Sequence, residues 1–208
     1  NEEERKLTAY HEAGHAVVAR SLPKTDPVHQ ITIIPRGRAG GFTMTLPKED
    51  RSYGTRQGMR EQILHLLGGR VAEMLTLDDI STGASNDIQR ATDIARDMIT
   101  KYGFSERLGT VNYSDSEEVF LGRDFTSSKK YSEEVAAEID DEIRRMIGEC
   151  LDETKEILKA HMTELENVAQ ALLLVETLDG EQFERLFTGE ITPEALADEL
   201  NIRRQEQE

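Results

Sequence analysis

Residues Leu7 to Ser21 read LTAYHEAGHAVVARS and contain the pattern on which the fold and the chemistry of this chain depend. Apolar and small residues recur at helical spacing and Pro23 follows closely, so the sequence predicts a helix over Leu7–Ser21. His11 and His15 lie four residues apart, which on a helix leaves their side chains roughly 40° apart in direction. Both imidazoles therefore point the same way, and their reach suits a tetrahedral Zn²⁺ ion.

Glu12 lies between the two histidines, close enough to touch a water on the metal without being a ligand itself. Zinc lowers the pKa of its water to about 7, and a neighbouring carboxylate can accept the proton as the water attacks a carbonyl carbon. The alternative is a pair of packed histidines on a core-facing helix surface shared with Leu7 and Val18. We disfavour it, because two adjacent buried imidazoles without a metal or an acid partner cost free energy.

Zinc enzymes of this kind have a third protein ligand and keep a fourth position open, yet no third histidine follows soon after His15. His65 falls opposite the apolar residues of a helix predicted over Arg56–Leu77, so we expect it in solvent. We interpret His29, at the start of a predicted strand, and His161, at a helix end, as structural. A carboxylate is therefore the expected third ligand.

Two carboxylates compete for this position. Asp87 opens a helix predicted to run to about Tyr102, and it lies about 50° from the centre of the apolar stripe, so it can face inward. The residues alone leave it equally a zinc ligand or a first-turn acid that favours the helix dipole. Glu73 follows Gly68 and Gly69, which permit close helix contact. It is a ligand, an acceptor behind a ligand imidazole, or an exposed glutamate.

The other elements place this site in a fold that we expect to be mainly α, with a small β-sheet in the N-terminal half. Runs rich in β-branched residues predict strands over Val28–Ile34 and Phe42–Leu46, which can pair as a hairpin. Further along we predict a short strand over Leu108–Tyr113, a loop over 114–130, and helix from about Ser132, interrupted at Asp179-Gly180. One domain is expected over 1–190, with the metal site in 7–103, a helical half in 128–188, and an acidic, weakly ordered tail over 191–208.

The composition excludes several classes of function. The 208 residues include 41 acidic and 25 basic ones, for a net charge of −16, which disfavours nucleic-acid binding and docking on anionic lipid. A single cysteine, Cys150, excludes an intramolecular disulfide framework and a Cys-rich metal cluster. Apolar runs such as Ala171–Val175 are too short to span a bilayer. The chain begins with Asn1 rather than Met, so we expect a piece of a longer protein.

Four stretches make the chain resemble the peptidase domain of the FtsH family, the membrane-anchored ATP-dependent zinc proteases. They are Leu7–Val18, Gly68–Glu73 (GGRVAE), Ser81–Ile88 (STGASNDI) and Tyr102–Ser105 (YGFS). The resemblance implies His11, His15 and Asp87 as zinc ligands, Glu12 as the catalytic base, and Glu73 as the acceptor behind a ligand imidazole.

The same resemblance implies a zinc-dependent endopeptidase that hydrolyses unfolded or extended polypeptides in the quality control of membrane and cytoplasmic proteins. It also implies a homo-hexamer at the cytoplasmic face of the bacterial inner membrane. The membrane would be reached only through segments outside this otherwise soluble sequence. No G-x-x-x-x-G-K-[ST] loop occurs here, so ATP would be hydrolysed by an AAA ATPase portion that this sequence lacks.

A substrate must be extended at such a site, and Gly41, Phe42, Thr43 and Met44 are the candidate residues that bind it. Main-chain pairing to an edge strand accepts many sequences, although a plain sheet strand explains the same pattern. A different class of function also stays open, in which the chain is a metal-stabilised helical module for oligomerisation without catalysis. Three protein ligands plus water would favour the enzyme, whereas four protein ligands would favour the structural role.

Overall fold

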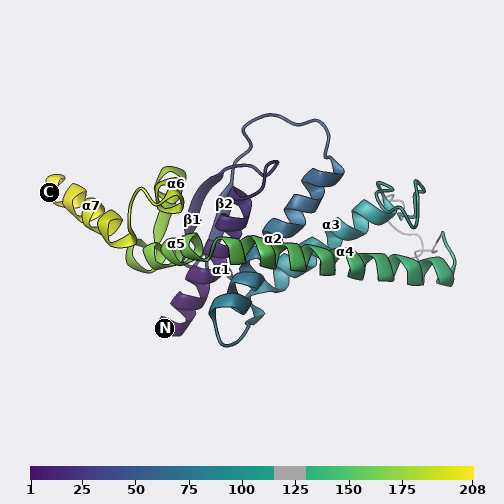
Figure 1. The fold of residues 1–208 in the computed structure, drawn as a ribbon, viewed down its shortest axis with the longest axis horizontal. Coiled ribbons are helices and arrows are strands. Elements are labelled where there is room, and N and C mark those ends of the chain that lie inside the picture. The colour runs from purple at the N-terminus through teal and green to yellow at the C-terminus, as the bar shows by residue number, and fades with distance from the viewer. Residues whose placement is uncertain (115–129) are drawn as a thin grey trace.

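The computed structural model describes residues 1–114 and 130–208 and confirms a mainly α fold with a small sheet. Helix α1 spans Glu2–Arg20, is capped by the side chain of Asn1, and lies at the centre of the molecule (Figure 1). It is buried continuously from Ala9 to Ala19. The elements that pack around it are α2 (Arg56–Thr76), α5 (Met162–Val175), β1 (Val28–Thr32) and β2 (Phe42–Thr45). The candidate metal ligands on α1 therefore lie inside the protein.

Helices α1 and α2 approach each other closely because glycines lie at their crossing. A Cβ atom on Gly14 would stand 2.4 Å from the carbonyl oxygen of Gly68 and 2.5 Å from Cβ of Ala72. A Cβ atom on Gly68 would in turn stand 2.8 Å from the carbonyl oxygen of Gly14. The close helix contact expected at Gly68 is confirmed, and it brings α2 within reach of the two histidines.

Three antiparallel strands form a sheet in the order β2-β1-β3. Strand β1 pairs with β2, with Ile31 opposite Thr43, which confirms the predicted hairpin. Strand β3 (Thr177–Asp179) was not predicted, and it pairs with the other side of β1 with Leu178 opposite Ile31. Strand β2 therefore lies at an edge of the sheet.

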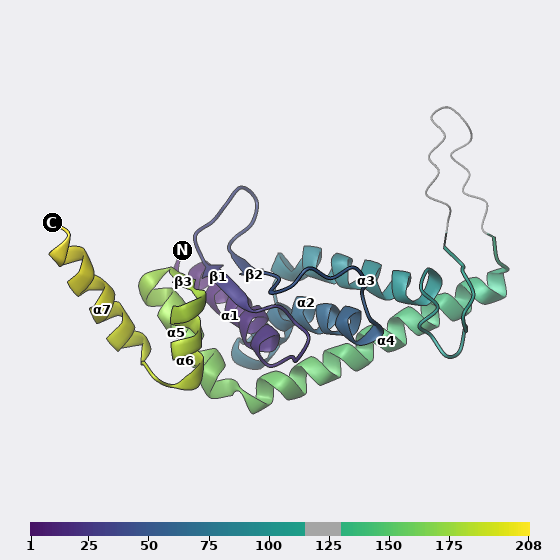
Figure 2. The same ribbon diagram turned by 90° about the horizontal axis from the view of Figure 1, so that it is seen from above.

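A 3-10 turn over Thr82–Ala84 leads into α3 (Ser85–Thr100), which packs against α2. Helix α4 (Glu133–Ala160) begins at the N-cap Ser132 and runs along α2 and α3 (Figure 2). The chain that joins α3 to α4 turns at Gly103 and Gly109, both with positive φ. The strand predicted over 108–113 is wrong, because these residues form no strand. Leu108 and Tyr113 instead pack against the core. Most of the predicted loop 114–130 lies outside the described residues.

The C-terminal half is helical, as expected, but it breaks at His161 between α4 and α5. Asp179 caps α6 (Gly180–Thr188) in a capping box with Gln182. Helix α7 (Pro193–Glu206) then extends away from the rest of the chain (Figures 1 and 2), within the segment expected to be weakly ordered. Leu196 in its first turn is fully buried, whereas residues 201–208 are exposed. Weak order of this last part stays a prediction.

None of the helices among residues 1–114 and 130–208 combines the length and apolarity needed to cross a lipid bilayer.

Candidate metal centre

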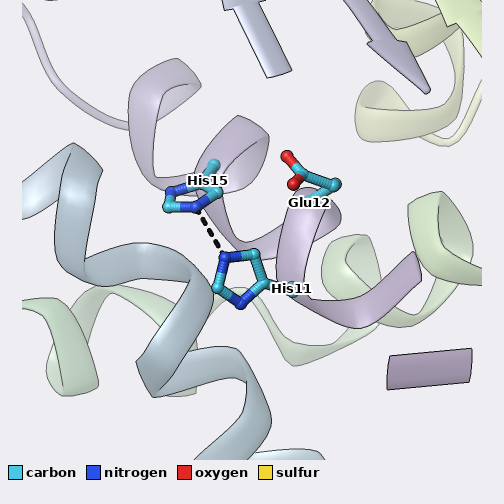
Figure 3. Close-up of side chains that lie close together, drawn as sticks. All are labelled: His11, Glu12 and His15. Carbon is cyan, nitrogen blue, oxygen red and sulfur yellow. Dashed lines mark hydrogen bonds between the residues drawn. The ribbon is translucent and has the colours of Figure 1, made fainter. Parts of the chain in front are cut away.

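His11 and His15 lie one turn apart on the buried part of α1, and Figure 3 shows a nitrogen of each ring pointing toward the other, with the Glu12 carboxylate to one side. Their Nε2 atoms are 3.1 Å apart, and the ring planes are inclined at 80°. The two residues are 7% and 6% exposed. Two imidazole nitrogens at this separation need a proton or a cation between them, because two lone pairs would repel.

Asp87, in the first turn of α3, brings a carboxylate to the same point. Its Oδ2 lies 3.0 Å from Nε2 of His11 and 3.1 Å from Nε2 of His15. With the 3.1 Å between the two nitrogens, three donor atoms form a nearly equilateral triangle. Ligand atoms at about 2.0–2.2 Å from a tetrahedral Zn²⁺ stand about 3.3–3.6 Å apart, so the triangle matches this ion to within about half an ångström.

Hydrogen bonds at the other ring nitrogens determine which nitrogen of each histidine faces this point. The carbonyl oxygen of His65 only accepts, so the Nδ1 of His15, 2.8 Å away, must carry the hydrogen. The Nδ1 of His11 lies 2.7 Å from Oε2 of Glu73, and the other oxygen of Glu73 accepts from the Ser81 N–H at 2.8 Å. Each Nε2 can thus present its lone pair to a metal, as metal-ligating histidines do.

The acids around His11 dominate the electrostatics of the metal-free site. Burial alone would lower the pKa of His11, but hydrogen bonds to Asp87 and Glu73 raise that pKa to about 9. Burial would raise the pKa of Asp87, yet the hydrogen bonds from His11 and His15 hold it far below its usual value. The pKa of Glu73 is lowered in the same way by His11 and Ser81, against its burial. The centre therefore attracts a cation, and in the metal-free chain a proton on His11 takes that place.

Glu12 lies beside the triangle and not in it. A carboxylate oxygen of Glu12 is within 4.8 Å of a ring nitrogen of each histidine, whereas Oδ2 of Asp87 lies at 3.0 Å and 3.1 Å from their Nε2 atoms. Glu12 is 7% exposed, and its Oε2 accepts a hydrogen bond from the hydroxyl of Thr43 at 2.7 Å. This placement suits a base next to a metal better than a fourth ligand.

A cavity of about 750 Å³ opens over these groups. Its walls include Gly41, which precedes the edge strand, and Phe42 and Thr43 of that strand, with Leu66 of α2 and Arg90 of α3 on other sides. Met44 does not line the cavity and is exposed. The candidate metal centre therefore adjoins Gly41 and the first two residues of β2, Phe42 and Thr43.

The donor set itself identifies the kind of metal that fits. Two neutral imidazoles and one carboxylate, with one side open to a cavity, are typical of catalytic zinc sites. Among the described residues, no other side chain forms a hydrogen bond with the three donor atoms. The residues present thus fit a three-ligand Zn²⁺ with an open position.

Comparison with known proteins agrees with this geometry. The profile of peptidase family M41 matches residues 1–186. The chain belongs to peptidase family M41.

Three relatives of this M41 chain are named ATP-dependent zinc metalloproteases. FtsH 2 of Alkaliphilus metalliredigens is 65% identical over 92% of the chain and 28% of its own length. FtsH 1 of a Thermoanaerobacter species is 60% identical over 91% of the chain and 31% of its length. FtsH of Bacillus subtilis is 48% identical over 93% of the chain and 31% of its length. The chain thus spans less than a third of the length of these relatives.

The prediction for His65 in this M41 chain is wrong. We expected a solvent-exposed side chain, but His65 lines the cavity and its ring centroid lies 5.7 Å from that of His15. Burial, together with the neighbouring His15, lowers the pKa of His65 to about 3. A usable signal was present, because His65 precedes Gly68 and Gly69 by three and four residues and so shares their face of α2.

The remaining histidines of the M41 chain lie away from the centre, as expected. His29 is exposed on β1, and the ring of His161 packs against Phe187 at 5.5 Å between centroids. Nothing in the sequence indicates the bond between Thr43 and Glu12, because this bond joins two elements whose mutual position only the fold determines.

Proposed function

We propose that this chain is a zinc-dependent endopeptidase domain in which His11, His15 and Asp87 hold the metal. The observation that carries the proposal is the convergence of their three donor atoms within 3.0–3.1 Å at the wall of an open cavity. Bound Zn²⁺ would supply a Lewis acid that polarises the scissile carbonyl and acidifies a water. Glu73 orients His11 through its 2.7 Å hydrogen bond.

Glu12 is the general base of the proposed reaction. Its carboxylate stands beside the donor triangle at the cavity wall, where it can take a proton from the attacking water. The same carboxyl group can then pass the proton to the leaving amine.

The substrate is proposed to be an unfolded or extended polypeptide. Strand β2 lies at an edge of the sheet, and Gly41, Phe42 and Thr43 border the cavity, so an extended segment can lie alongside it. Main-chain hydrogen bonds to such an edge tolerate many side chains. Met44 is exposed on the same strand and would contact only residues farther along the substrate.

The role of the whole protein is a proposal that rests on its relatives. They are named ATP-dependent, so we propose that an AAA ATPase portion outside this sequence delivers substrate to the cavity. Homo-hexamer assembly, a position at the cytoplasmic face of the bacterial inner membrane, and a task in protein quality control belong to the same proposal.

The proposal is tested by zinc stoichiometry together with proteolysis of an unfolded protein, with and without a chelator. We expect one Zn²⁺ per chain and cleavage of casein that stops on chelation and returns with Zn²⁺. A metal-bound chain in which a fourth side chain completes the coordination, and which cleaves nothing, would instead be a non-catalytic oligomerisation module.

A further inference from the structure

The hydroxyl of Thr43 joins the edge strand to the proposed base. Its Oγ1 lies 2.7 Å from Oε2 of Glu12 and 3.0 Å from the main-chain oxygen of the same residue. We propose that Thr43 is a positioning residue that holds the carboxylate of Glu12 in the orientation needed for proton transfer. This inference rests on the proposed function of Glu12 as general base.

The chemistry of the two acceptors supports a directed contact. A hydroxyl has one hydrogen to donate, and both acceptors within its reach belong to Glu12. The carboxylate is the nearer of the two, and a hydrogen bond to an ionised acceptor is about twice as strong as one to a neutral oxygen. The hydrogen of Thr43 is therefore directed at Oε2 of Glu12.

Occupation of Oε2 leaves the other oxygen of Glu12 to act as the base. The described residues give Oε1 no hydrogen bond, and the carboxylate lies at the wall of the cavity. A glutamate with free rotation about its terminal bonds would present either oxygen in many directions. The bond from Thr43 selects one orientation and so reduces the entropy lost on the way to the transition state.

The strand that carries Thr43 gives the contact a second consequence. Thr43 pairs with Ile31 of β1 across the sheet, while Gly41 passes so close to β1 that a Cβ atom there would stand 2.5 Å from the Thr32 carbonyl oxygen. Strand β2 is thus held firmly on one side and borders the substrate cavity on the other. A peptide that pairs with the main chain of β2 would therefore lie at a fixed distance from the carboxylate of Glu12, because the Thr43 hydroxyl ties that carboxylate to the same strand.

The test compares Thr43→Val with Thr43→Ser in the zinc-loaded chain, on a short fluorogenic peptide that needs no unfolding. Val keeps the shape and removes the donor, so we expect kcat to fall about tenfold to thirtyfold, with KM, bound zinc and Tm unchanged. Ser keeps the donor and should restore most of kcat. Thr45→Val is the matched control, because Thr45 lies on the same face of β2 and does not line the cavity.

Three results would overturn the inference. They are an unchanged kcat in Thr43→Val, a Ser variant as slow as the Val variant, and a loss of zinc or of Tm that accounts for the fall in kcat. Glu12→Gln, measured beside them, separates this inference from the function on which it rests. If Glu12→Gln is fully active, Glu12 is not the base and the proposed function fails. If Glu12→Gln is inactive while Thr43→Val has a normal kcat, only the positioning role of Thr43 fails.

Discussion

Gly69 on α2 lies directly against the imidazole of His11 on α1. A Cβ atom on Gly69 would stand 2.5 Å from both Cε1 and Nε2 of His11, and 2.7 Å from Nε2 of His15. Two of these three atoms are the nitrogens that face the proposed metal position, so even a methyl group at residue 69 would occupy the space of the proposed ligands. The absence of a side chain at Gly69 is therefore a requirement of the proposed metal centre.

Gly69→Ala should displace both imidazoles and weaken Zn²⁺ binding by at least about tenfold. The rings cannot move aside freely, because Glu73 and the main chain of His65 hold them at their Nδ1 atoms. Equilibrium competition with a chromogenic chelator measures this affinity. Gly148→Ala is the control, since Gly148 lies within α4 and a Cβ atom there meets nothing within 4 Å. That variant should keep its zinc and gain about 0.5–1 kcal/mol of stability. Equal zinc affinities in both variants would refute the role of Gly69.

Asp87→Asn should lower the Zn²⁺ affinity by more than about a hundredfold, since it removes the charged oxygen at 3.0 Å and 3.1 Å from the two Nε2 atoms. Metal content after dialysis against a weak chelator measures the loss. Asp93→Asn makes the same change at an exposed position of α3 and should retain one zinc per chain. Full zinc retention in Asp87→Asn would transfer the third-ligand role to another residue.

The pKa of His11 makes zinc binding depend on pH. In the metal-free chain that pKa is about 9, above the ordinary 6.5, so His11 is protonated at neutral pH. Because the pKa of His11 is higher in the folded chain than in the unfolded chain, protonation of His11 adds to the free energy of unfolding of the metal-free chain. This contribution is complete below about pH 6.5 and is lost as the pH rises through about 9. Binding of Zn²⁺ at about pH 7.5 should therefore release the proton of His11, and this release should disappear above about pH 10.

Isothermal titration calorimetry in buffers of different ionisation enthalpy counts the released protons. A count that is the same on both sides of the pKa of His11 would contradict the assignment of the raised pKa to this residue.

The edge strand predicts how the substrate backbone is recognised. Two versions of one peptide substrate can carry N-methyl groups on its odd-numbered or on its even-numbered backbone amides. Only one of these two sets of amides can donate hydrogen bonds to Gly41–Thr43, so we expect KM to rise about tenfold for one version and not for the other. The side chains are the same in both peptides, so the comparison isolates the main chain. Equal KM values for the two methylated peptides and the parent peptide would argue that β2 is only a structural strand.

Much of the centre was predictable because it depends on local spacing. The separation of His11 and His15 on one helix fixes their common direction, and Gly14 with Gly68 indicates a close helix crossing before any coordinates are known. The residues alone could not choose between Asp87 and Glu73. That choice depends on how α2 and α3 lie against α1, which only the fold and the family resemblance supply.

The errors have physical causes as well. His65 was judged against the large apolar residues of its own helix, but the side of α2 that meets α1 is marked by glycines, which carry no hydrophobic signal. Strand β3 has three residues, too few for an alternating pattern, and it is held by long-range pairing to β1. The apolar residues over 108–113 resemble a strand, yet Gly103 and Gly109, both with positive φ, turn the chain before and within this stretch, and Leu108 and Tyr113 pack against the core without strand structure.

The central claim is that three side chains hold one zinc while Glu12 acts as the base beside it. The most direct test is to measure bound zinc and casein cleavage in the same preparations of wild type and Glu12→Gln. We predict one zinc per chain in both, with cleavage by the variant reduced by at least about a hundredfold. A Glu12→Gln variant that keeps its zinc and cleaves casein at the wild-type rate would contradict the account.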